Sequence, residues 1–194
     1  MNIQAHIKKH LLESSRVQKE TYRHCRREIE AAAMAIVDVY YKKGGTVFLF
    51  GNGGSAADAQ HIAGELFSFF RMHRIPLAAN ALTTDTSVLT SISNDLGYEY
   101  IFSRQLEALA TPKDAVIALS ASGNSQNVLN GVQVAKGRGI RTICLTGKDG
   151  GKLAKVADIA IKVPSADVAH IQEAHTAIGH SICGIVEAIL FGNE

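Results

Sequence analysis

The chain has 194 residues, of which 46% are hydrophobic and 20% are charged, and its formal net charge is +2. This composition is typical of a globular protein and excludes a disordered one, and the length suits one domain with a substantial core. The net charge is small and no block of five or more like charges occurs, so the sequence has no basic segment that would bind nucleic acid or an anionic membrane. We therefore expect neither nucleic acid nor a membrane as a partner.

Cysteine usage and the amino terminus predict the compartment. Cys25, Cys144 and Cys183 are odd in number, widely spaced and free of any C-x-x-C pair, which favours a reducing environment. Residues 1–15 lack the continuous apolar core of a signal peptide, and no later run approaches the eighteen or so apolar residues of a membrane span. These features predict a soluble cytoplasmic protein.

The predicted elements begin with two helices over residues 3 to about 43, which end at the glycines of "KKGG" because glycine adopts positive φ readily. Five short apolar runs follow, and their length and β-branched content favour buried strands. They cover residues 46–50, 76–82, 115–121, 141–146 and 158–163. Helical spacing separates them, as in "SQNVLNGVQVAKGRG", and a long apolar helix is expected over residues 168–190.

Strands that alternate with helices predict an α/β fold, a three-layer sandwich with a five-stranded parallel sheet between helices. No linker rich in Pro, Gly or Ser divides the chain, so residues 1–194 are expected to form a single domain with a sheet core over about 46–164. The extra helices at both termini suit two roles equally well. They either cover the sheet or form an oligomer interface.

Two similar sequences follow the first and third expected strands, "GNGGS" and "SGNS". Parallel strands end at one edge of a sheet, where the N–H groups of the following helices favour an anion, so both corners should face one crevice. Glycines at 51, 53 and 54 allow close approach of a ligand, and Ser55 is placed to cap the helix or to bind a phosphate oxygen. Ser120, Ser122 and Ser125 add hydroxyl groups without a lysine or arginine, which would suit a sugar phosphate. For either corner alone, an ordinary capped turn is the competing interpretation.

The motifs of nucleotide-binding proteins are missing from the sequence. No G-x-G-x-x-G follows the first expected strand, and no G-x-x-x-x-G-K-[ST] occurs. Dinucleotide and ATP chemistry are therefore disfavoured.

Candidate acid, base and metal-binding side chains occur on two helices. On a helix that begins near Ser55, His61 and Glu65 lie on one face with Cβ atoms about 5 to 6 Å apart, so they can share a metal or a proton. A lone helical histidine is more often a core or surface residue, and it is the position directly after the glycine corner that favours function here. The last helix offers Gln172, Glu173, His175 and His180. Gln172 and His180 are about 12 Å apart along a helix axis, so spacing alone does not make them partners.

Six stretches together resemble the sugar isomerase (SIS) domain family, and within it the phosphoheptose isomerase group, from about Val47 to Glu187: "GNGGSAADAQH", "LTTDTS", "NDLGYEYIFSRQLEAL", "SGNS", "LTGKDGGK" and "IQEAH". The resemblance implies an aldose–ketose isomerase that converts sedoheptulose 7-phosphate to D-glycero-D-manno-heptose 7-phosphate through an enediolate. This is the first step toward the ADP-heptose and lipopolysaccharide heptose of bacterial surfaces. The resemblance also implies a cytoplasmic homotetramer with active sites at subunit interfaces and no nucleotide or redox cofactor.

Carried over by position, the resemblance makes Glu65 and His180 the acid and base pair. It implies one zinc ion per subunit, held by His61, Glu65, Gln172 and His180, and such a set of imidazole, carboxylate and amide donors suits zinc. The implied contacts to the phosphorylated seven-carbon sugar come from Asn52, Gly53, Gly54, Ser55, Glu65, Asn94, Asp95, Ser120, Ala121, Ser122, Ser125 and Gln172.

Two departures from the family pattern leave alternatives open. A Gly-Arg pair usually follows the glutamate, whereas Phe69 stands here with Arg71 displaced, and a threonine is usual where Ala121 stands. An isomerase of another phosphosugar is therefore one alternative. A non-catalytic SIS domain that binds a phosphosugar or a protein, as in the relatives that bind the replication initiator, is another, and exposed Phe69 and Phe70 would suit it.

Overall fold

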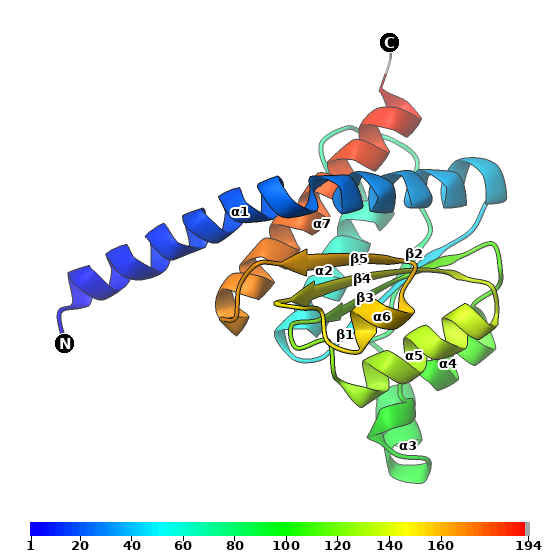
Figure 1. Cartoon of the computed structure of the whole chain (residues 1–194). Coiled ribbons are helices and arrows are strands. Elements are labelled where there is room, and N and C mark those ends of the chain that lie inside the picture. The colour runs from blue at the N-terminus through cyan, green and yellow to red at the C-terminus, as the bar shows by residue number, and fades with distance from the viewer. Residues whose placement is uncertain (193–194) are drawn as a thin grey trace.

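The computed structural model describes residues 1–192 and forms one α/β domain (Figure 1). Five parallel strands make a single sheet in the order β2-β1-β3-β4-β5, which confirms the expected fold class. The strands are β1 (Val47–Gly51), β2 (Ala79–Ala81), β3 (Ala115–Ser120), β4 (Arg141–Gly147) and β5 (Ile159–Val163). The α-helices are α1 (Ile3–Asp38), α2 (Gly54–Phe67), α3 (Thr86–Asp95), α4 (Ser103–Leu109), α5 (Gln126–Gly137), α6 (Leu153–Val156) and α7 (Val168–Phe191).

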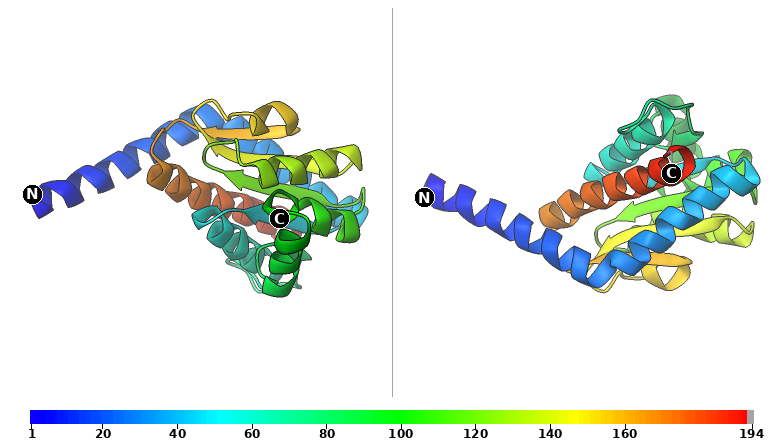
Figure 2. Two further views of the ribbon diagram at one scale, coloured as in Figure 1. Left: turned by 90° about the horizontal axis from the view of Figure 1, so that it is seen from below. Right: turned by 90° about the horizontal axis from the view of Figure 1, so that it is seen from above.

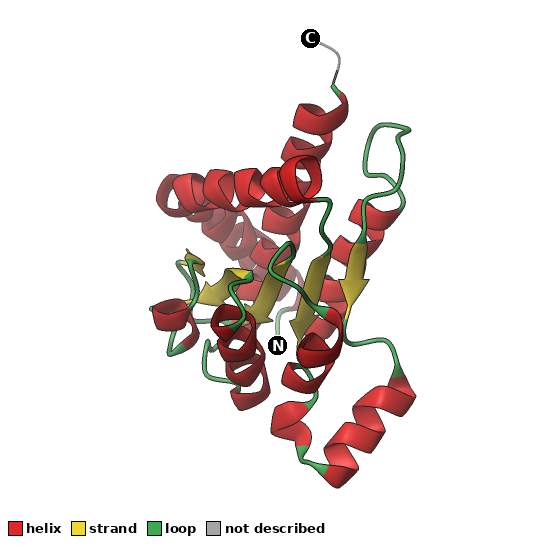
Figure 3. Ribbon diagram, turned by 90° about the vertical axis from the view of Figure 1, so that its right-hand side faces the viewer, coloured by secondary structure: helices red, strands yellow, loops and turns green. Residues whose placement is uncertain are grey.

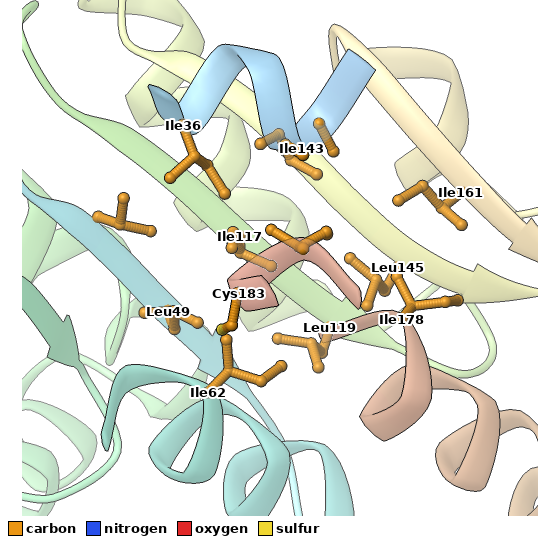
Figure 4. Close-up of a cluster of buried hydrophobic side chains, with 14 of the residues drawn as sticks. Ile36, Leu49, Ile62, Ile117, Leu119, Ile143, Leu145, Ile161, Ile178 and Cys183 are labelled. Atoms are coloured by element: carbon orange, nitrogen blue, oxygen red, sulfur yellow. The ribbon is translucent and has the colours of Figure 1, made fainter. Parts of the chain in front are cut away.

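Helices cover both faces of the sheet (Figures 1 and 3). Helices α1, α2 and α7 pack on one face, and α4, α5 and α6 pack on the other. The first of these two cores is built from branched aliphatic side chains of the strands that meet those of the three helices (Figure 4). It includes Ile36, Leu49, Ile62, Ile117, Leu119, Ile143, Leu145, Ile161 and Ile178. Its burial holds α2 and α7 side by side, and these two helices carry the candidate acid and base residues.

The amino-terminal region is one continuous helix, so the expectation of two helices was wrong. Residues 3–43 contain neither Pro nor Gly, so nothing in the backbone interrupts the helix before its end. Helix α1 continues through a π-helical turn, Val39–Lys43, and stops at Gly44, whose φ is +59° as the "KKGG" ending predicted. The amino-terminal half of α1 projects away from the rest of the domain (Figure 2).

Helix α7 is long and apolar enough to cross a membrane by length and composition alone. It has buried side chains at Ile171, Ile178, Ile182 and Val186, which pack in the core shared with α1, α2 and the sheet. Packing inside the domain therefore accounts for its apolar composition.

The three cysteines are free and buried. Burial raises the pKa of Cys144 and of Cys183 to about 12, so both thiols are neutral near pH 7. The structure therefore gives them a packing role.

The strand order places the two polar corners next to each other. Strand β1 pairs with the parallel strand β2 on one side and with the parallel strand β3 on the other, so the order in which successive strands are added to the sheet reverses at β1. In open α/β sheets a crevice forms at the carboxyl ends of the strands at such a switch point, and ligands bind there. The corners "GNGGS" and "SGNS" follow the two strands that define this point.

Candidate active site

The two corners line one pocket of about 220 Å³, which confirms that they face the same crevice. Its walls are Asn52, Ser55, Leu119, Ser120, Ala121, Ser122, Ser125, Val168 and Gln172. The hydroxyl oxygens of Ser120 and Ser125 lie 3.3 Å apart, and Gln172 from α7 closes the pocket. Within the described part of the chain no lysine or arginine lines it, so an anion bound there would be held by hydroxyl and backbone N–H groups. We call this cavity the serine pocket.

The helices that begin at the serine pocket have no side-chain cap. Gly53 precedes α2 and Ser125 precedes α5, and neither makes a capping hydrogen bond to its helix. Ser55 lies inside the first turn of α2 and so does not cap the helix. Its side chain is 3% exposed and lines the serine pocket. The N–H groups of Ser55 and Ala56 already donate to the carbonyl oxygens of Asn52 and Gly53 over 3.0 and 2.9 Å. The N–H groups of Gly54, Gln126 and Asn127 have no acceptor among the described residues, so these three are available to phosphate oxygens.

Two glycines in these corners lie in close contact with other segments. A Cβ on Gly54 would lie 2.6 Å from the side-chain oxygen of Gln172, so a side chain there would displace the Gln172 amide from the start of α2. Gly123 has a φ of +64°, and a Cβ there would overlap the carbonyl group of Gly150. The segment after β4 contacts the "SGNS" corner, where Leu153 N–H donates to the Gly123 carbonyl over 2.9 Å.

The side chain of Asn52 is held by residues that the sequence did not single out. Asn52 and Asn127 exchange two amide hydrogen bonds of 2.8 Å, and the Tyr98 hydroxyl donates to Asn52 Oδ1 over 3.0 Å. Both lone pairs of Asn52 Oδ1 are therefore occupied, while one N–H of its amide is left for a ligand. The only sequence signal for Asn127 was its position two residues beyond "SGNS".

Helices α2 and α7 run side by side in the same direction, and successive turns of one contact successive turns of the other. Gln172 lies against Gly54, and the Thr176 hydroxyl donates to Asp58 Oδ1 over 2.7 Å one turn later. A further turn along, the Nε2 atoms of His61 and His180 are 2.7 Å apart. This register brings together histidines that are 119 residues apart in the chain.

Glu65 completes a cluster with the two histidines. Its Oε1 is 3.6 Å from His61 Nε2, and the donor atoms of His61, Glu65 and His180 all lie within 4.8 Å of one another. The side chains of His61 and Glu65 are 46% and 23% exposed, so solutes can reach them. Gln172, the fourth expected ligand, has its amide at Gly54, on the same side of α7 and two turns before His180.

The donor set of this histidine cluster fits a zinc ion. Two imidazole nitrogens at 2.7 Å need a proton or a cation between them, because two lone pairs facing each other repel. Zinc takes imidazole nitrogen and carboxylate oxygen, and a catalytic zinc site has three protein ligands with one position open. His61, Glu65 and His180 supply such a set.

Asp58 is a candidate that the sequence reasoning missed. Burial raises the pKa of its carboxyl group, and the hydrogen bond from Thr176 opposes that shift. Its Oδ2 is buried without a hydrogen-bond partner among the described residues. An acidic residue three positions before His61 on the same helix face was the available signal. A lone buried acceptor at this point is suited to a ligand or a bound water.

The segment after α2 positions His180. The ring of Phe70 stacks on the His180 imidazole, with centroids 5.3 Å apart and an angle of 22°. Phe70 is therefore partly buried, contrary to the expectation that it is exposed, whereas Phe69 is 41% exposed and contacts His73. The guanidinium group of the displaced Arg71 lies over the Phe70 ring, 4.9 Å from its centroid.

A buried ion pair holds this segment in place. Glu187 accepts the backbone N–H groups of Phe70, Arg71 and Met72 at 2.7 to 3.1 Å, and its Oε1 is 3.1 Å from Arg74 Nε. Both charged side chains are 2% exposed. Burial raises the pKa of Glu187, but the three N–H groups and Arg74 outweigh it, so the net pKa lies below its usual range. Arg74 also donates to the Glu65 carbonyl over 2.9 Å, which ties the pair to the end of α2.

Asn94 and Asp95 lie outside the serine pocket and the histidine cluster of their own chain. They form the last turn of α3, are exposed, and hydrogen-bond to each other over 2.8 Å. A larger hollow of about 820 Å³ lies between β2, α3 and α4, but neither glycine corner nor any histidine lines it. We therefore place the candidate chemistry at the smaller pocket.

His175 does not belong to the site. It is fully buried, its Nε2 is 3.2 Å from the Thr146 carbonyl oxygen, and burial lowers its pKa to about 4. The imidazole is thus neutral near pH 7 and joins α7 to β4.

The buried His175 makes stability depend on pH. Below the ordinary histidine pKa of 6.5 the unfolded chain binds a proton that the folded chain binds only near pH 4, so stability falls as the pH drops through this range. This effect amounts to at most about 3 kcal/mol. We expect His175→Gln, which keeps an N–H donor, to flatten the dependence. Urea unfolding of both proteins between pH 7.5 and 4.5 checks this, and equal slopes would contradict it.

Comparisons with known proteins agree with this geometry. The family model described as "SIS domain" matches residues 10–147. A phosphoheptose isomerase of Aneurinibacillus thermoaerophilus is 51% identical over 168 residues, 87% of this chain and 84% of that protein. One of Trichlorobacter lovleyi is 54% identical over 78% of each chain. The structure of the phosphoheptose isomerase of Neisseria gonorrhoeae is 38% identical, with a TM-score of 0.91 over 96% of this chain and all of that one. The chain therefore belongs to the SIS domain family and, within it, to the phosphoheptose isomerases.

Proposed function

We propose that the protein interconverts sedoheptulose 7-phosphate and D-glycero-D-manno-heptose 7-phosphate. The main support for this reaction is that the serine pocket and the histidine cluster lie along the same pair of helices, α2 and α7. From Gly54 to His61 the register advances seven residues, which is about 10 Å along α2. A seven-carbon sugar carries its phosphate at one end and its reacting C1 and C2 at the other, so it would place each end at one of these two sites.

The residues of the site have distinct roles in the proposed reaction. The free N–H groups of α2 and α5, with Ser55, Ser120, Ser122 and Ser125, bind the phosphate. Glu65 takes a proton from C1 and returns it to C2, and His180 moves a proton between the oxygens on C2 and C1. Phe70 holds the His180 imidazole in position through the stacking contact.

We infer one zinc site per subunit, formed by His61, Glu65 and His180, with Gln172 as the fourth candidate ligand. A bound zinc ion would act as a Lewis acid toward the substrate oxygens and so stabilise negative charge on the enediolate. The carboxylate of Glu65 has two oxygens, which allows it to bind the metal through one and to face the substrate with the other. No nucleotide or redox cofactor enters the proposed reaction.

We further propose a cytoplasmic homotetramer with active sites at subunit interfaces. The projecting half of α1 carries an exposed apolar stripe of Ile3, Ile7 and Leu11 at helical spacing, which a second copy of the chain would bury. Asn94 and Asp95, which lie outside the site of their own chain, would then contact the sugar bound by a neighbour. The product would serve the heptose of bacterial surface lipopolysaccharide.

A proton NMR experiment tests the proposed function. Purified protein is incubated with sedoheptulose 7-phosphate in D2O, with added zinc and after chelation. We expect conversion with deuterium at the exchanged carbon, and loss of activity on chelation that zinc restores. No conversion by zinc-loaded protein would overturn the assignment of this sugar and direct the search to other phosphosugars. Activity unaffected by chelation would overturn the zinc site.

A further inference from the structure

A second group of metal-binding side chains lies where α1 contacts the start of α7. We call it the α1–α7 cluster, and it consists of His10, His170 and Glu173. His10 Nε2 is 2.9 Å from Glu173 Oε1, and His170 Nδ1 is 3.1 Å from Glu173 Oε2. The centroids of the two imidazole rings are 4.7 Å apart, and the donor atoms of all three residues lie within 4.8 Å of one another.

This cluster is separate from the candidate active site. His170 and Glu173 are three residues apart, so they share a face of α7, and that face is turned toward α1. Gln172 and Thr176 lie on a different face, which is turned toward α2. The two groups of ligands therefore belong to different helix pairs, and an ion at one would not share ligands with the other.

We propose that His10, His170 and Glu173 bind a divalent transition-metal ion, with zinc as the best chemical match, and that the ion joins α1 to α7. Two imidazoles and one carboxylate are a donor set that zinc uses in proteins. His170 is 6% exposed and already points at the carboxylate, and His10 is presented from the other helix, so binding requires little rearrangement. The ion would fix the helix whose amino-terminal half projects from the domain.

Zinc content measured in a background that lacks the first site tests this proposal. The double variant His61→Gln/His180→Gln is loaded with zinc chloride, dialysed exhaustively and assayed for bound metal. We expect about one zinc ion per chain to be retained, and addition of His10→Gln to remove it. The matched control is His24→Gln in the same background, because His24 lies on the same helix 3.3 Å from Glu20 but belongs to no cluster of three metal-binding side chains among residues 1–192. It should leave the zinc content unchanged.

Cobalt gives a second measurement that does not depend on activity. Loading of the double variant with cobalt(II) should give the visible absorption of a tetrahedral site, and Glu173→Gln as well as His10→Gln should abolish it. Far-UV circular dichroism checks that these variants are folded, and His10 is replaceable because 43% of its side chain is exposed. Zinc retained despite His10→Gln, or no zinc and no cobalt spectrum in the double variant, would overturn the proposal. These measurements involve no substrate, so their outcome is independent of the proposed isomerisation.

Discussion

Replacement of Glu65 by glutamine is expected to lower kcat for sedoheptulose 7-phosphate by about 100- to 10,000-fold, the usual contribution of a general acid or base. Glutamine has nearly the same shape but cannot accept the proton from carbon. The side chain of Glu65 is partly exposed, and the contact that ties this residue to Arg74 uses its backbone carbonyl. The fold and the oligomer should therefore be preserved, and steady-state kinetics with size-exclusion chromatography measures both effects.

Two further measurements assign the loss to proton transfer. Glu107→Gln serves as the matched control, since Glu107 is an exposed glutamate on α4 that pairs with Arg104. Zinc content must also be compared, because Glu65 is a candidate ligand as well as the candidate base. A variant that keeps its zinc but loses turnover and deuterium exchange would identify Glu65 as the base. Full turnover by Glu65→Gln would remove it from the reaction.

Glu187→Gln is expected to lower the free energy of unfolding by about 3 to 5 kcal/mol, because it leaves the charge of Arg74 buried without a partner. It also weakens the contacts that hold Phe70 against His180, so kcat should fall even under conditions where the variant is folded. Urea unfolding at fixed protein concentration gives the first effect, and kinetics at low temperature gives the second.

The double variant Arg74→Met/Glu187→Met separates charge from backbone contacts. Removal of both charges should recover part of the stability, as is common when a buried ion pair is replaced by apolar side chains. Recovery should be incomplete, because the N–H groups of Phe70, Arg71 and Met72 would still lack their acceptor. A loss below about 1 kcal/mol in Glu187→Gln would show that the pair is solvated and would contradict the structure.

Local patterns were sufficient to predict the sheet and the two corners "GNGGS" and "SGNS" that line the serine pocket. The five apolar runs coincide with the strands to within one residue, except that β2 covers only residues 79–81 of the expected 76–82. Strand formation here depends on short runs of buried residues, and glycine at 53 and 123 reflects backbone conformations that other residues disfavour. The prediction of two amino-terminal helices was wrong, and the local sequence already argued against it. Residues 3–43 contain no Pro or Gly that would interrupt a helix.

The arrangement of the site was not contained in any local pattern. On their own helices, His61 and His180 are two separate histidines, and eight residues between Gln172 and His180 argued neither for nor against a shared site. Only the parallel packing of α2 on α7, driven by burial of Ile62 and Ile178, brings the imidazoles within 2.7 Å. Tertiary packing also places the Phe70 ring on His180 and the Glu187 carboxylate at the backbone N–H of Phe70. The sequence by itself determined which segments become strands and where the two glycine-containing corners form, since those depend on neighbours along the chain. The tertiary structure decided which side chains meet, since helix packing depends on the whole core.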